Sequence, residues 1–294
     1  MGLTRRSTRI AARRGGFALA CALWIGACAP ADRGSSDPGS GDLAPGADAP
    51  AAGDFVERGP LPPVGDPRGG DATQIASLLV APADGGERLV VGFARPDGLP
   101  ADRVGPVRAE VLRERGVVRL TLPLQVVSAA IVDNHFGTFL ADRAFVVRPL
   151  AGDSLHLDLH LRSPALVRVR ALERPALVLV ELRAGGDPLP RSAPAAQRVV
   201  VLSPVPGAAR YPLTIEGYAR TFEANVIAEL RGRRGEPART RTTAADYLAA
   251  WGEFRMRIER GPTGPVELFV GEHSAADGAE QGVRIELEIE PPSP

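Results

Sequence analysis

The chain contains 294 residues, of which 35 are basic and 35 are acidic, so its formal net charge at pH 7 is +0. This length accommodates two domains of ordinary size, each able to bury a hydrophobic core. The balanced charge argues against a broad nucleic-acid-binding surface, because such a surface needs a basic face. We therefore expect folded domains that have no nucleic-acid partner.

Residues 1–28 have the layout of a secretory signal: arginines come first, the apolar run Phe17 to Ile25 follows, and small residues lead to Cys28. The apolar run is too short to span a bilayer, which takes about 20 apolar residues. Its end, Ile25-Gly26-Ala27-Cys28, resembles a bacterial lipobox. The resemblance implies that Cys28 is acylated and anchors an extracytoplasmic protein to the cell membrane, or to an outer membrane. A secretory signal cut elsewhere and an uncleaved anchor are the alternatives.

Both cysteines of the chain, Cys21 and Cys28, lie in this first segment. Removal of the signal leaves Cys28 alone, so we expect no internal disulfide in the mature protein. Residues 29–73 are rich in Pro, Gly, Ala, Ser and Asp, and Phe55 is their only aromatic residue. Such a composition cannot offset the entropy of folding, and it predicts a disordered tether between the lipid anchor and the folded part.

From Ile75 onward, apolar residues recur with the period of two that is typical of β-strands. Gly and Pro punctuate these runs at intervals typical of sandwiches, and a Gly- and Pro-rich break interrupts them once. The sequence thus predicts an all-β chain with two β-sandwich domains, at residues 74–186 and 197–291, joined by a linker at 187–196. The last strand, Val283 to Glu290, is expected to bury its apolar face and expose its charged face to water.

The second predicted domain carries five motifs in order: Ser203-Pro204 with Gly207, Pro212 to Ala219, Phe222 to Val226, Trp251 to Phe254, and Ser274 to Gly278. Together they resemble the immunoglobulin-like domain associated with bacterial spore germination proteins, the Gmad type, over about residues 197–291. Trp251 and Phe254 can fill the space between two sheets. The resemblance implies a binding or assembly module of the envelope, linked to sporulation or germination, and it supplies no catalytic residues.

The first predicted domain resembles the AMIN-like β-sandwich modules of bacterial envelope proteins. The likeness is concentrated in Ser154 to Leu161, Ala165 to Arg170 and Arg174 to Leu182, a run of strands that ends in a Pro-led strand. The resemblance implies a module that binds peptidoglycan or positions envelope machinery.

His156, Asp158 and His160 are the residues most like a metal-binding cluster. They alternate with leucines, so they share one face of a strand, and the two histidines would be about 13 Å apart at roughly 3.3 Å per residue. Zinc ligands lie about 2 Å from the ion, so one ion cannot bridge the pair. We expect a solvated strand face, with no metal site and no cofactor.

Nucleophilic catalysis has little support in the sequence. The chain has no Gly-x-Ser-x-Gly motif, Cys28 carries the lipid, and Ser154 beside His156 lacks an oriented third partner. We predict a non-catalytic lipoprotein that binds or scaffolds envelope components: peptidoglycan, another wall polymer, or an exported protein complex. The alternative is an envelope hydrolase or carbohydrate-active enzyme whose site the sequence does not reveal.

One charged segment is a candidate for recognition. Its arginines fall within eleven positions and are Arg231, Arg233, Arg234, Arg239 and Arg241. Guanidinium groups suit carboxylates and phosphates, so a hairpin that displays them could bind an anionic wall polymer or lipid headgroups. The alternative, which we favour, is a solvated sheet edge, where charges discourage aggregation between sheets.

Overall fold

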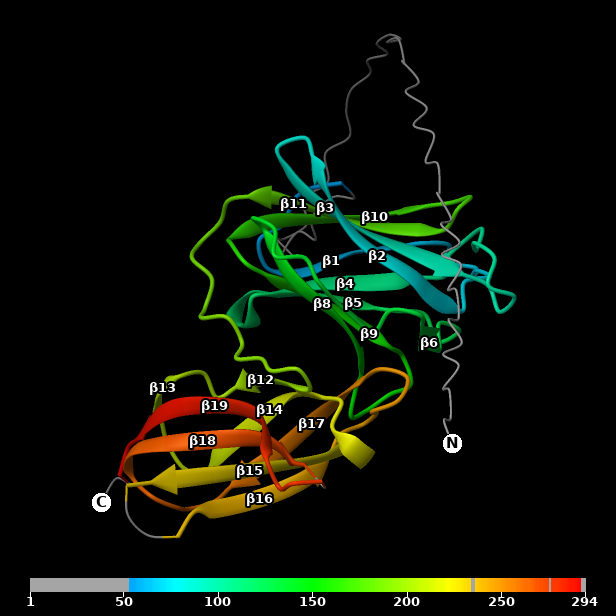
Figure 1. Ribbon diagram of the computed structural model, residues 1–294. Coiled ribbons are helices and arrows are strands. Elements are labelled where there is room, and N and C mark those ends of the chain that lie inside the picture. The colour runs from blue at the N-terminus through cyan, green and yellow to red at the C-terminus, as the bar shows by residue number, and fades with distance from the viewer. Residues whose placement is uncertain (1–52, 234–235, 275, 292–294) are drawn as a thin grey trace, which may run out of the picture. The chain divides into compact units, whose positions relative to one another are not determined.

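The computed structural model describes residues 53–233, 236–274 and 276–291 (Figure 1). The signal, Cys28, residues 29–52 of the predicted tether, and Arg234 lie outside these ranges. Within them, the helices are two single 3-10 turns, η1 (Arg113–Arg115) and η2 (Phe222–Ala224), and the other elements are strands. The predicted all-β fold is therefore confirmed. Neither helix of the described part is long or apolar enough to cross a membrane.

The first sandwich consists of two sheets that precede residue 185. One sheet has the order β10 (Ala165–Leu172), β11 (Leu177–Ala184), β3 (Gly86–Ala94), β2 (Gln74–Ala83) and β6 (Ser128–Ala129). The other contains β1 (Gly59–Val64), β4 (Val107–Leu112), β5 (Val117–Thr121), β9 (His156–Leu161) and β8 (Ala141–Arg148), and β7 (Asp133–His135) also pairs with β8. Leu78 of β2, Val91 of β3 and Leu157 of β9 are fully buried in the core of this sandwich.

Strand β1 lies within the segment predicted to be a disordered tether, so the predicted limit at residue 73 is wrong. β1 pairs antiparallel with β4, and its Leu61 side chain belongs to the core. Further upstream, Val56 forms a backbone bridge with Val167 of β10. Three of the six residues in β1 are prolines, which lack an N–H group, and this composition resembles that of a tether. An edge strand tolerates proline, and β1 is the edge of its sheet.

The second sandwich packs three strands against five. The three are β12 (Val199–Ser203), β14 (Leu213–Ala219) and β17 (Trp251–Ile258). The five lie in the order β13 (Gly207–Ala209), β19 (Glu280–Ile289), β18 (Gly264–His273), β15 (Asn225–Gly232) and β16 (Ala238–Thr243), as Figure 1 shows in yellow to red. The predicted amphipathic strand is confirmed in β19, since Val283, Ile285, Leu287 and Ile289 are all buried in the core.

The two sandwiches share one sheet. Strands β8 and β17 pair in parallel, with Val147 opposite Trp251, and this pairing makes the order β1-β4-β5-β9-β8-β17-β14-β12 continuous. A separate apolar cluster lies at this junction and contains Phe145, Val147, Val200, Tyr218 and Trp251, contributed by both sandwiches. Residues 185–198, between β11 and β12, contain no strand. Backbone pairing and buried apolar contacts, and not only the linker, therefore connect the two sandwiches.

Candidate functional site

The polar face of β9 is largely buried, so the expectation of a solvated face is wrong for Asp158 and His160, whereas His156 is partly exposed. Asp158 is 0% exposed and His160 is 9% exposed. One face of β9 packs into the core of the first sandwich through its leucines, and the other contacts Tyr218 of the second sandwich. Alternation along a strand shows that its two faces differ, but it does not show which surroundings the polar face has.

Asp158 is the centre of a buried ion pair at this junction. Arg119 of β5 donates two hydrogen bonds to it, from Nε to Oδ1 at 2.8 Å and from Nη2 to Oδ2 at 2.7 Å. The hydroxyl of Tyr218 also donates to Oδ2. Burial raises the pKa of the Asp158 carboxyl, but the hydrogen bonds and charge of Arg119 outweigh burial and hold that pKa below its usual value. Asp158 is therefore ionised and fully engaged by groups from both sandwiches.

Tyr218 and His160 complete the junction as neutral groups. Burial, followed by the charge of Asp158, raises the pKa of the Tyr218 hydroxyl well above its usual value. Burial lowers the pKa of the His160 imidazole. The His160 ring packs edge-on against Phe145, with ring centroids 5.2 Å apart, and against Tyr218 at 6.2 Å. These groups support the packing of the two sandwiches.

A second set of polar groups lies on the outer face of the β13-β19-β18-β15-β16 sheet, which is the face turned away from the core of the second sandwich. Its centre is Phe269 of β18, which is 1% exposed although it lies outside that core. A side chain at Gly271 or Gly282 would come within 2.9 Å of the Phe269 ring, so these glycines leave room for the ring to lie on the sheet.

Six charged or titratable side chains surround Phe269, and we call them the ion-pair cluster: Glu229, Arg231, Arg239, His273, Glu280 and Arg284. The guanidinium of Arg284 lies 5.7 Å from the centre of the Phe269 ring, and that of Arg231 lies 6.0 Å from it. Both distances are within the range of a cation–π interaction. The cluster and the ring therefore form one ordered surface on the sheet.

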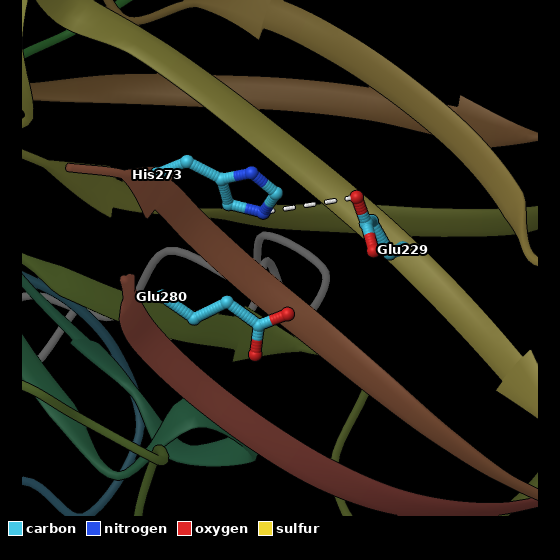
Figure 2. A group of neighbouring side chains, drawn as sticks. All are labelled: Glu229, His273 and Glu280. Atoms are coloured by element: carbon cyan, nitrogen blue, oxygen red, sulfur yellow. Dashed lines mark ion pairs between the residues drawn. The ribbon is translucent and has the colours of Figure 1, made fainter. Parts of the chain in front are cut away.

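Part of this cluster has the composition of a metal site. Figure 2 shows Glu229, His273 and Glu280, whose ligand atoms all lie within 4.8 Å of one another. However, Arg231 Nη2 lies 2.5 Å from Glu229 Oε2 and also donates to Glu280 Oε1. The other oxygen of Glu229 lies 3.2 Å from Arg239 Nε, and the other oxygen of Glu280 pairs with Arg284.

Each carboxylate oxygen of Glu229 and Glu280 thus already faces a guanidinium group. A divalent cation bound there would lie next to Arg231 and would be repelled by it. Hydrogen bonding by Arg231 also lowers the pKa of the Glu280 carboxyl, because the guanidinium group stabilises its ionised form. The arrangement therefore fits a resident guanidinium better than a metal ion.

A groove of about 730 Å³ adjoins the ion-pair cluster on the same face. Three neighbouring strands supply its floor: Arg231 of β15 lies opposite Glu267 of β18, which lies opposite Glu286 of β19. One row further, Pro265 of β18 lies opposite Glu288 of β19. Arg233, just after β15, and Arg191, from the segment between the sandwiches, also line the groove.

Residues 198–279 match the family model described as the immunoglobulin-like domain of bacterial spore germination. The match confirms the predicted resemblance to this domain and links the second sandwich to germination. It spans β12 to β18 and ends just before β19, which completes the outer sheet of the immunoglobulin-like domain. The comparison with curated proteins and the comparison with solved structures give no match.

The predicted arginine-rich segment does not act as one patch in the immunoglobulin-like domain. Arg231 and Arg239 pair with Glu229 in the ion-pair cluster, and Arg233 lines the groove. Arg241 is exposed on β16, the edge strand of the sheet, as expected for a charged edge. Arg234 lies outside the described residues.

Sequence reasoning missed the acidic side of the groove. Glu286 and Glu288 belong to the polar face of β19, which was expected only to meet water. Their alternation with Ile285 and Leu287 places both carboxylates on the outer face, and this signal was visible in the sequence. No pattern in the sequence indicated that Arg191, from the predicted linker, lies at the same groove.

Proposed function

We propose that this protein is a non-catalytic cell-envelope lipoprotein that binds or scaffolds envelope components, with peptidoglycan as its ligand. In this proposal, acylated Cys28 anchors the chain outside the cytoplasm, and the two sandwiches bind the wall polymer. A role in germination in particular is supported by the family match to the immunoglobulin-like domain.

The observation that carries the proposal is the open groove on the immunoglobulin-like domain. Four of its charged side chains, Arg191, Arg233, Glu286 and Glu288, are exposed and form no ion pair within the described residues. Nearby Arg231 and Glu267, by contrast, are each in an ion pair. Charged groups that do not satisfy one another are available for a polar ligand.

The first sandwich supports the same proposal through its resemblance to AMIN-like modules, which implies binding to peptidoglycan. The buried ion pair between Asp158 and Arg119, together with Tyr218, connects this sandwich to the immunoglobulin-like domain. We propose that the two sandwiches contribute to one binding unit, in which the junction fixes the spacing between two contact surfaces.

Co-sedimentation with purified peptidoglycan tests the proposal. The full chain is expected to pellet with the polymer, and the Arg191→Gln, Arg233→Gln double variant is expected to pellet less. Arg241→Gln, an exposed arginine away from the groove, is the matched control. If arginine contacts contribute, binding weakens with salt, because the Debye length falls from about 10 Å at 0.1 M to about 3 Å at 1 M.

A wild-type chain that stays in the supernatant at every salt concentration would refute peptidoglycan as the ligand. Crosslinking in cells then tests the remaining possibility, which is that the same surface scaffolds an exported protein complex. Hydrolysis of the polymer during the assay would refute the non-catalytic role.

A further inference from the structure

We infer that the groove on the immunoglobulin-like domain binds a short zwitterionic peptide, with a carboxylate of the peptide at Arg233 and an amine at Glu286 and Glu288. The inference rests on the proposed function, since it names the part of the wall polymer that this groove would recognise.

The first step is the separation of paired from available charges on this face. Arg231 is held by Glu229 and Glu280, and Glu267 by Arg284. These ion pairs fix the shape of the surface next to the groove. The groups left without an ion pair in the described part of the chain are of both signs: Arg191 and Arg233, and Glu286 and Glu288.

The second step is the spacing of these charges. Arg233 follows β15, whereas Glu286 and Glu288 lie on β19, and β18 separates the two strands. Neighbouring strands are about 4.8 Å apart, so the backbones of the two charged sides are separated by about 10 Å. An extended peptide advances about 3.5 Å per residue. A peptide of about three residues therefore places its two ends at the two sides.

The third step is the floor between the charged sides. Pro265 of β18 is exposed there, and Gly232 of β15 adds no side chain to the floor. The row that runs from Arg233 over Pro265 to Glu288 therefore has an uncharged residue at its middle, and the charge of Glu267 in the neighbouring row is paired with Arg284. This allows the uncharged backbone of a peptide to cross the sheet between its two charged ends.

The charges also exclude simpler ligands. A polyanion at Arg233 would approach Glu286 and Glu288 and be repelled by them, and a polycation would meet Arg191 and Arg233 in the same way. A ligand with a cation and an anion at opposite ends satisfies both sides of the groove. Arg191, near Pro206 and beyond β19, is available for a second carboxylate.

The test uses triglycine with free ends as the probe and the full chain as the protein. Chemical-shift titration by NMR is expected to show binding of triglycine and at least tenfold weaker binding of N-acetyl-triglycine amide, which lacks both end charges. Arg233→Gln and Glu288→Gln should each weaken triglycine binding by about three- to fivefold, the effect expected for one exposed ion pair. Arg241→Gln and Glu173→Gln are matched controls outside the groove.

The substituted side chains are exposed, so each variant is expected to fold. Thermal melting of each variant verifies this. Equal binding of free and blocked triglycine, absence of triglycine binding, or binding that both groove variants leave unchanged would each overturn the inference. If the protein still pellets with peptidoglycan in such a case, the proposed function stands and a different surface recognises the polymer. If it does not pellet either, the proposed function fails independently.

Discussion

Replacing Asp158 by Asn tests whether the buried ion pair holds the two sandwiches together. The carboxylate is 0% exposed and accepts two hydrogen bonds from Arg119 and one from Tyr218. The substitution would leave the Arg119 charge with Glu253, at 3.3 Å, as its remaining carboxylate partner. Removing one partner of a buried pair typically costs about 3–5 kcal/mol, so we expect Asp158→Asn to lower the free energy of unfolding by about that amount.

Tyr218→Phe is the milder variant at the same place. It removes one hydrogen bond to a charged acceptor and keeps the ring packing against Phe145. Such a bond contributes about 1.5–3 kcal/mol, so the loss should be smaller than for Asp158→Asn. Asp153→Asn, at an exposed position of the loop before β9, is the matched control and should change stability by less than about 0.5 kcal/mol.

Denaturant unfolding measured by tryptophan fluorescence is the assay. In a chain that lacks residues 1–28, Trp251 is the only tryptophan. Its indole Nε1 donates to Asp133 Oδ2 at 2.8 Å, and its ring is part of the junction cluster. Its fluorescence therefore reports on the junction itself, and circular dichroism reports on the strands of both sandwiches.

The pH dependence supplies a second, independent readout. The pKa of Asp158 is lower in the folded state than its usual value of 3.8, so the ionised group stabilises the fold above pH 4. This contribution is lost as pH falls below 3.8 and through the lower folded-state pKa. The stability difference between wild type and Asp158→Asn should therefore shrink in acid. A difference under about 1 kcal/mol at pH 7, or one that stays constant below pH 4, would refute the reasoning.

Three further outcomes are expected. Cys28→Ser should abolish lipid labelling and detergent partitioning, because each buried methylene of an acyl chain contributes about 0.8 kcal/mol; a mature N-terminus other than modified Cys28, found by mass spectrometry, would contradict this. Leu61→Ala should lower the free energy of unfolding by about 2–3 kcal/mol in a denaturant titration, since β1 contributes to the core; an unchanged free energy would indicate that β1 belongs to the tether and not to the folded domain. Excess zinc should leave the melting temperature unchanged, because guanidinium groups already occupy the ion-pair cluster; a zinc-dependent rise would show that the cluster of Glu229, His273 and Glu280 binds metal.

The sequence was most informative where a residue's surroundings follow from its own strand. The alternation in β19 correctly predicted which side chains are buried, because a strand that covers a core has one apolar face. The five ordered motifs predicted the immunoglobulin-like domain through their resemblance to that family, and the match over residues 198–279 confirms it. These features depend on local chemistry, which a sequence displays directly.

The sequence failed where one strand depends on another that is distant along the chain. Composition predicts a tether at β1, because prolines lower strand propensity and the pairing with β4 cannot be read from the residues of β1 alone. Periodicity predicts a solvated polar face for β9, although Asp158 and His160 of that face are buried at the junction with the second sandwich. Arg119 and Tyr218, which bind Asp158, are separated from it by 39 and 60 positions.

The groove shows, within a single site, both what the pattern of one strand predicts and what depends on distant strands. The sequence by itself determined that β19 carries glutamates on one face and that arginines gather near the end of β15. Only the tertiary structure decided which of these charges neutralise one another, because that depends on the order β19-β18-β15 and on the register between the strands. Arg231 and Glu280 became structural partners, whereas Arg233 and Glu288 were left facing the solvent. The physical reason is that ion pairing requires contact within a few ångströms, and in a β-protein the strand order sets those distances.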